Sequence, residues 1–404
     1  MERFADTNST GTGIPFEESH PTGRYKYADN TGGVSMVDQE NVMSKVIKDL
    51  ASKIGKNVFT GNISGLRGIS TPAYVHSSMS YLDTTIYEAT CYEYYIRRAI
   101  AEDAEPMKTL QYLVCARLAN VSVGVSQIGT RQPLNPILGE TSTFISESGM
   151  RMYTEQTSHH PPITHFLCLG PEDCPFEYSG YFEYNAQFYK TMTGITFTQP
   201  GKQTMKLPNG GMYTIEPEKK EITGILTTSK KLVLAGNLII TDVVNKLKAV
   251  VSFDVNEPKR RGFLGGWMGG IGGGHDKLKE GEISANREDL LEINILKAPG
   301  TSDKDIISKG SGSYLENITF VNDEKHTWDI NMPCKTEFKK PTKEGESGWH
   351  ILPSDSSCRD DGAAINAKNW EEAEAKKHEM EQLQRHDAKL RKESEAKRTV
   401  EKKA

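Results

Sequence analysis

The sequence predicts a mainly β fold of the α+β class, in which an antiparallel β-barrel follows a helical segment and precedes a long charged helix. Three observations support this prediction. Alternating or β-branched strings with turn signals between them fill residues 140–335, apolar residues recur at helical spacing over 82–128, and residues 370–404 are rich in Glu, Lys, Arg and Ala without Gly or Pro. Many sequential strands joined by short turns are typical of a barrel.

The N-terminal residues 1–40 are rich in Gly, Ser, Thr, Asn and Asp and have no sustained apolar periodicity. A segment of this composition buries too little apolar surface to offset its loss of conformational entropy. We therefore predict a disordered N-terminal arm over 1–40.

Helices are expected on both sides of a flexible joint. One helical face is formed by five apolar residues, namely Met43, Val46, Ile47, Leu50 and Ile54. The glycines of 61–68 and Pro72 separate this helix from the following segment, so it can move as a unit. Over 82–128 the spacing again predicts helices with a buried face, and Pro106 is expected to begin the second of them.

A glycine-rich string, GFLGGWMGGIGGG at 262–274, interrupts the β region directly after three cationic residues. It lacks the GK[ST] ending of a P-loop, so we do not predict a nucleotide site. Two interpretations remain. The string is either a mobile loop or a loop that touches membranes through Phe263, Leu264, Trp267 and Met268.

Composition excludes several classes of protein. The chain has 49 basic and 54 acidic residues, a net charge of -5, so no overall positive field exists to bind nucleic acid. Its six cysteines form no CxxC pair and have no zinc-finger spacing, which indicates reduced thiols of a cytosolic protein. No stretch approaches the roughly 18 apolar residues that a membrane span needs. We expect a cytoplasmic protein that binds neither metal nor any other cofactor.

The most unusual string is EQTSHHPP at 155–162. Adjacent histidines on an extended strand point to opposite sides, so His159 and His160 converge only if the turn into the prolines redirects one of them. A zinc site would need a third ligand, and a hydrolase would need a nucleophile that no GxSxG motif supplies. The remaining interpretations are anion recognition by the two imidazoles or a pair of structural histidines.

Near the C-terminus, Lys377, Glu381 and Arg385 are four residues apart. On an α-helix residues at this spacing drift by only about 40° per step and share one face. The triplet is either a binding face or a ladder of surface ion pairs.

Three strings resemble motifs of the oxysterol-binding protein family. EQTSHHPP is similar to the family fingerprint EQ-x-SHHPP, and PLNPILGE at 133–140 is similar to PLNPxLGE, which lies a short distance before it. The third match is K-x3-E-x2-QR, which begins at Lys377. The resemblance covers all but about the first forty residues.

This resemblance implies a nearly closed antiparallel β-barrel around an apolar lipid tunnel, with an N-terminal lid helix and C-terminal helices. We expect a short, single-domain member over 41–404. Its parts would be a lid region at 41–81, a helical segment at 82–128, the barrel at 129–340, and a C-terminal segment with the charged helix at 341–404.

The resemblance implies lipid binding and transfer without catalysis. A sterol or phosphatidylserine would be carried in the tunnel and exchanged for phosphatidylinositol 4-phosphate. The protein is expected to be a monomer that contacts organelle membranes transiently, through the lid and residues such as Phe263, Leu264 and Trp267. The alternative is a sensor that binds phosphoinositide or sterol and regulates a partner without net transport.

The same resemblance implies a phosphoinositide headgroup site at the tunnel mouth. In this site His159 and His160 would bind phosphate, and Leu134 and Asn135 would offer polar groups. The triplet on the charged helix would complete the site: two cations close over the headgroup, and Glu381 orients a cation or accepts inositol hydroxyls.

One position departs from the family pattern. The family has Lys immediately before PLNP, where this chain has Arg131-Gln132. Because Gln132 donates without charge, its site would lose about 1.5–3 kcal/mol of charge-assisted hydrogen bonding, unless Arg131 reaches over.

Overall fold

The structure of the chain is a computed structural model. It describes residues 24–25, 27–36, 71–127, 131–189, 193–225, 230–253, 255, 283–300, 302–321, 323–341 and 351–401. The predicted helix at 43–54 and the glycine-rich loop at 262–274, with Phe263, Leu264 and Trp267, fall outside these ranges. No helix in the described ranges is long and apolar enough to cross a membrane.

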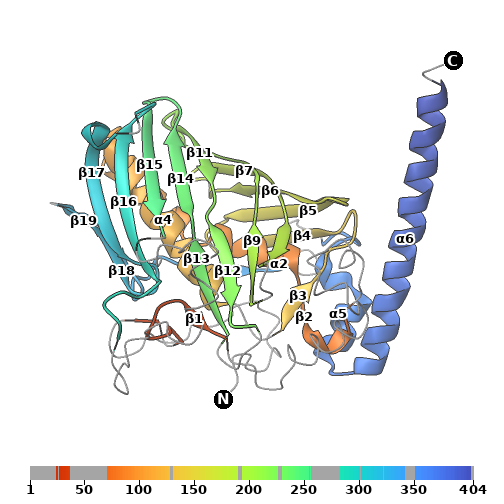
Figure 1. The fold of residues 1–404 in the computed structure, drawn as a ribbon. Helices are drawn as coiled ribbons and strands as arrows, with labels where there is room; N and C mark the ends of the chain where they lie inside the picture. Colours follow the sequence, from red (N-terminus) through yellow and green to blue (C-terminus); the bar gives the residue numbers. More distant parts are fainter. Residues whose placement is uncertain are drawn as a thin grey trace.

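An antiparallel sheet of 13 strands dominates the described chain (Figure 1). Its order is β19 (Asp323–Asp329), β18 (Asn317–Phe320), β17 (Ile306–Ser313), β16 (Leu290–Lys297), β15 (Leu247–Ser252), β14 (Asn237–Asp242), β11 (Met212–Glu216), β10 (Gly201–Lys206), β7 (Glu177–Glu183), β6 (Pro162–Leu169), β5 (Arg151–His159), β4 (Thr141–Ser146) and β20 (Phe338–Lys339). The mainly β fold is therefore confirmed. In the described ladder β19 and β20 are the two ends, and their pairing into a closed ring is not seen.

Two smaller sheets complete the β structure. The first has five strands in the order β1 (Val34–Ser35), β13 (Lys231–Ala235), β12 (Lys219–Thr223), β9 (Gly194–Thr198) and β8 (Asn185–Phe188). The second is a parallel pair, β2 (His76–Ser80) and β3 (Gln132–Leu134), and both strands carry residues of the candidate site.

The predicted helical segment is confirmed by α2 (Tyr81–Thr84), the 3₁₀ turn η4 (Thr85–Glu88), α3 (Tyr92–Ala101) and α4 (Pro106–Ser126). Pro106 begins α4, as predicted. Every residue of α4 from Thr109 to Val123 is buried, because the helix packs against α3, η4 and the strands β14, β15 and β19. Figure 1 shows α4 beside β14 and β15. A helix enclosed in this way needs no polar face.

The C-terminal region consists of the 3₁₀ turn η7 (Ser356–Cys358), α5 (Asp360–Asn366) and α6 (Trp370–Glu401). The predicted long charged helix is thereby confirmed. Figure 1 shows α6 starting beside α5 and extending beyond the rest of the described chain. Ala373 and Lys377 near its start are buried, whereas Leu383 and Leu390 are exposed.

The prediction of disorder over 1–40 is wrong for the described residues 24–25 and 27–36. Val34 in β1 pairs with Leu232 in β13 and is 1% exposed. Composition did not indicate this order, because the partners that hold the segment in place are distant in sequence.

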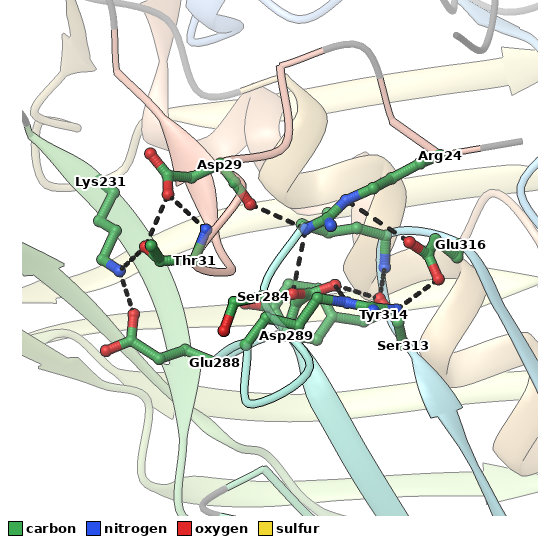
Figure 2. Close-up of polar contacts among 12 residues, drawn as sticks. Arg24, Asp29, Thr31, Lys231, Ser284, Glu288, Asp289, Ser313, Tyr314 and Glu316 are labelled. Carbon is green, nitrogen blue, oxygen red and sulfur yellow. Dashed lines mark hydrogen bonds and ion pairs between the residues drawn. The ribbon is translucent and has the colours of Figure 1, made fainter. Parts of the chain in front are cut away.

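Polar contacts hold this N-terminal segment on the sheets (Figure 2). Arg24 Nη2 lies 3.1 Å from Asp289 Oδ1, and both side chains are almost completely buried. Lys231 donates to Thr31 Oγ1 at 3.0 Å and forms an ion pair with Glu288. These polar contacts add to apolar ones, since Tyr25 and Val34 belong to the main hydrophobic core and Tyr27, Ala28 and Met36 pack against it.

Candidate functional site

The fingerprint histidines lie at the turn between β5 and β6. His159 ends β5 and is in register with Pro162, the first residue of β6, and the intervening His160-Pro161 bond is cis. The two imidazole centroids are 4.6 Å apart, with an angle of 58° between the rings. The histidines therefore converge, and the tight turn supplies the change of direction that an extended strand would not.

The environment of His159 favours its neutral form. Burial lowers its pKa below the ordinary value, the neighbouring His160 and Arg391 of α6 lower it further, and the nearby carbonyl of Pro136 partly opposes the shift. In the described part of the chain its buried Nδ1 makes no hydrogen bond. A bound anion would raise this pKa and give the ring nitrogen a partner.

The two motif strings meet in space. The Gly139 amide donates to the Gln156 carbonyl at 2.8 Å, and the Gln156 amide donates to the Glu140 carbonyl at 2.9 Å. These bonds attach the 133–140 segment to the strand that ends in the histidines. The two motifs, which follow one another in the sequence, therefore also lie side by side in the structure.

Glu140 and Arg359 fix the shape of this segment. Arg359 Nη1 donates to Glu140 Oε2 at 2.8 Å and to the Asn135 carbonyl at 2.7 Å. Burial raises the pKa of Glu140, although Arg359 and the hydroxyl of Ser80 oppose the shift. Asp361 accepts from the other edge of the same guanidinium at 2.7 Å. The buried ion pairs position the segment and leave the side chain of Asn135 exposed.

Leu134 has a different position from Asn135. It is 1% exposed and lies in a small apolar cluster separate from the main core, formed with Ala73, Ala364, Ile365 and Ala373, against which Trp370 packs. Its apolar side chain joins β3 to α5 and the start of α6. Any contribution of Leu134 to a headgroup must therefore come from its backbone.

The triplet on α6 does share one face. Lys377 Nζ lies 2.5 Å from Glu381 Oε1, and Arg385 Nη2 lies 3.5 Å from Glu381 Oε2. The Lys377 side chain is 9% exposed, whereas that of Arg385 is 60% exposed. The ladder thus extends from the packed start of α6 toward solvent, with Glu381 between two cations.

A buried histidine that sequence reasoning did not single out lies beside this ladder. His76 Nδ1 is 3.2 Å from the Pro133 carbonyl, which can only accept, so Nδ1 carries the proton. Its Nε2 then accepts from Thr71 Oγ1 at 2.8 Å and from the Gln132 amide at 3.4 Å. Burial, Lys377 and Arg359 together lower the pKa of His76 to about 4.

Substitution of His76 by Gln should reduce the acid sensitivity of the fold. The folded pKa is about 4 against 6.5 for the free side chain. Between these values the unfolded chain binds a proton that the folded chain does not, so stability is lost as pH falls from 6.5 to 4. We expect wild type to lose about 3 kcal/mol more than His76→Gln over this range.

Denaturant unfolding at pH 7 and pH 4 measures this difference. Exposed His378, which contacts Gln382 on α6, supplies the matched control, since His378→Gln should lose as much stability as wild type. Equal losses in His76→Gln and wild type would contradict the assignment.

Arg131 and Gln132 are both engaged. The Arg131 guanidinium lies over the Trp370 ring, 4.7 Å from its centroid. Gln132 donates to Thr71 Oγ1 at 3.2 Å as well as to His76. The Arg131 side chain is thus directed toward the start of α6. Gln132 belongs instead to a chain of hydrogen bonds with two uncharged groups, Thr71 and His76.

The described contacts place the predicted residues in two groups. His159, His160 and the 133–140 segment form one, with Arg391 nearby, and Lys377, Glu381 and Arg385 form the other. His76 connects the two groups, because Lys377 acts on its pKa while its ring contacts the Pro133 carbonyl. His76, Arg359 and Arg391 belong to no motif, and only their tertiary neighbours identify them. No group of three or more His, Cys, Asp or Glu side chains in the described ranges is arranged to hold a metal ion.

Comparison with known proteins gives a consistent result. The profile of the family described as oxysterol-binding protein matches residues 57–403. Oxysterol-binding protein 9 of Dictyostelium discoideum is 23% identical over 367 residues, which are 91% of this chain and 78% of that protein. Oxysterol-binding protein-related protein 8 of Mus musculus is 27% identical over 65% of this chain, but the match spans only 27% of the mouse protein.

Solved structures show the same fold. The Osh3 ORD in complex with PI(4)P from Saccharomyces cerevisiae has a TM-score of 0.59 at 18% identity, covering 85% of this chain and 84% of that one. The Osh1 ORD domain in complex with ergosterol has a TM-score of 0.58 at 18% identity, covering 81% and 77% of the two chains.

Proposed function

Because this chain belongs to the oxysterol-binding protein family, we propose that it transfers lipids between membranes, exchanging a sterol or phosphatidylserine for phosphatidylinositol 4-phosphate. As a member of this family it is a lipid-binding protein and not an enzyme. The phosphoinositide and the sterol are suggested by the ligands of the similar structures, PI(4)P in one and ergosterol in another. Phosphatidylserine is proposed from the motif resemblance alone.

The convergent histidine pair carries the phosphate part of the proposal. Two imidazoles 4.6 Å apart, one with a buried and unbonded Nδ1, offer donors to an anion that approaches the β5–β6 turn. Leu134 and Asn135 would contribute from the attached segment, and the α6 ladder would close over the headgroup. Each imidazole that takes up a proton on binding would add a charge-assisted hydrogen bond.

The lipid tail would lie in an apolar tunnel inside the large sheet, which we propose closes into a barrel with the predicted N-terminal helix at 43–54 as its lid. Residues 73–80 are not part of that lid, because η3 (Ala73–Val75) and β2 each contain buried residues and β2 pairs with β3. Apolar surface buried in such a tunnel is worth about 25 cal/mol per Å², which opposes release into water. Exchange therefore proceeds where a membrane replaces the lost apolar contacts. No covalent step is needed.

A competitive loading experiment tests this function. The purified chain is offered vesicles with sterol, phosphatidylserine and phosphatidylinositol 4-phosphate, re-isolated, and analysed by lipid mass spectrometry. Recovery of the phosphoinositide with one second lipid, together with transfer between donor and acceptor vesicles, would support exchange. Lipid binding without vesicle-to-vesicle transfer would contradict it and favour a lipid-responsive sensor.

Gln132→Lys is expected to tighten binding to phosphatidylinositol 4-phosphate vesicles by about tenfold or more, because an ammonium adds a charge-assisted hydrogen bond worth about 1.5–3 kcal/mol. Quantitative vesicle co-sedimentation measures the change. Gln382→Lys is the matched control, since it adds the same charge at an exposed position of α6. Equal affinities of Gln132→Lys and wild type would show that position 132 does not meet the headgroup.

A further inference from the structure

Two buried cysteines meet between the start of α3 and the segment that follows β19. Cys334 Sγ lies 3.8 Å from Cys91 Sγ, within hydrogen-bonding distance for two sulfurs. Cys91 is 0% and Cys334 is 5% exposed, and all six cysteines of the chain are free thiols. The pair lies far from the histidine turn in sequence and plays no part in the lipid function proposed above.

The backbone on both sides of the pair is held in place. The Cys91 amide donates to Asn120 Oδ1 at 2.7 Å, and the Cys334 amide donates to the Met332 carbonyl at 2.8 Å. A backbone bond of 2.8 Å from Thr336 to Thr90 fastens the two segments to each other. Because both thiols lie on segments that are held in place, the two sulfurs stay in contact. A small movement would bring them from 3.8 Å to the length of a disulfide bond, about 2.05 Å.

The charges around the pair distinguish its members. A hydrogen bond donated by the Cys91 thiol lowers the pKa of Cys334, and Arg98 adds to the effect, although burial opposes it. Burial and the same hydrogen bond raise the pKa of Cys91. Lys335 lies close enough for its charge to act on Cys91. Of the two thiols, Cys334 is therefore the one that ionises more readily, and a thiolate rather than a thiol is the nucleophile.

We propose that Cys91 and Cys334 are a redox-sensitive pair that hydrogen peroxide converts into an intramolecular disulfide. The Cys334 thiolate attacks peroxide and takes one oxygen as a sulfenic acid, releasing hydroxide that is protonated to water. Cys91 sulfur then attacks the sulfenic sulfur, loses its proton, and displaces a second water. Two thiols lose two electrons and two protons, and one peroxide becomes two waters.

The disulfide would join residues 243 positions apart in sequence and fasten α3 to the chain between β19 and β20. Cross-linking so long a loop restricts the unfolded chain strongly. We expect the oxidised protein to melt more than about 5 °C above the reduced protein. Reduction with dithiothreitol should reverse the shift.

Peptide mapping of the full chain tests the proposal. The reduced protein is treated with hydrogen peroxide, its remaining thiols are blocked with N-ethylmaleimide in denaturant, and a non-reducing digest is analysed by mass spectrometry. The expected result is a Cys91–Cys334 linked peptide that dithiothreitol releases. Free, alkylated Cys91 and Cys334 after oxidation of Cys358, which is the least buried cysteine, would overturn the proposal, as would a link to another cysteine.

Variants separate the disulfide from other oxidation. Cys334→Ala should abolish both the linked peptide and the peroxide-dependent rise in melting temperature. Cys358→Ser should keep both, because Cys358 lies in the turn η7 and contacts the Leu352 carbonyl rather than another thiol. A rise that persists in Cys334→Ala would contradict the assignment, and the wild-type peptide map decides the question even if that variant folds poorly.

Discussion

Replacing His159 and His160 together by alanine is expected to weaken binding to phosphatidylinositol 4-phosphate vesicles by about 100-fold or more. The imidazoles converge 4.6 Å apart at the β5–β6 turn, so a single phosphate can meet both rings. Loss of two charge-assisted hydrogen bonds, each worth about 1.5–3 kcal/mol, accounts for the expected change. Vesicle co-sedimentation at matched lipid concentrations gives the affinities.

The matched control for this prediction is His378→Ala. His378 is an exposed histidine on α6 that contacts Gln382, and its removal should leave binding unchanged. Thermal melting of both variants checks that the fold is retained. We expect it to be retained because the two histidines lie at the turn where β5 ends and β6 begins. Wild-type affinity in the folded double variant would show that the fingerprint histidines are structural and that the phosphate lies elsewhere.

Arg117→Ala is expected to destabilise the fold by about 3–5 kcal/mol, the largest effect on stability that we predict. Arg117 lies on α4 with its side chain 0% exposed, and its Nη2 is 3.3 Å from Oε2 of Glu218, which is also 0% exposed. It forms a second ion pair with Glu88, which also contacts Lys220 at 3.4 Å. Burial alone would raise the pKa of Glu218, but Arg117 and Lys220 hold it below its ordinary value.

The cost arises because Glu218 would remain buried after its main partner is removed. It must then keep an unpaired charge in the interior or bind a proton at neutral pH, and both are unfavourable. Denaturant unfolding measures the free energy. Lys206→Ala removes a pair with Glu177 whose side chains are 54% and 36% exposed, so it should cost less than about 1 kcal/mol. A similar small cost for Arg117→Ala would show that the interior tolerates the lone carboxylate.

Helices and strands were identifiable from the sequence because their patterns involve residues only a few positions apart. Apolar spacing and Pro106 were enough for α4, and the absence of Gly and Pro was enough for α6. The buried ion pair of Arg117 was not identifiable, because a helical pattern shows which residues share a face but not which charges oppose them. The same limit applies to residues 24–36, whose partners Lys231 and Asp289 are more than 190 positions away.

The motif strings by themselves were sufficient to name the family and to locate the histidines, since both depend on residue identity at fixed short spacing. Tertiary structure decided the rest. It turned His160 toward His159, directed Arg131 onto Trp370, and placed His76 beside Lys377, which lies 301 positions later. Distances and pKa values depend on burial and on charges brought close by packing, and no local pattern contains that information.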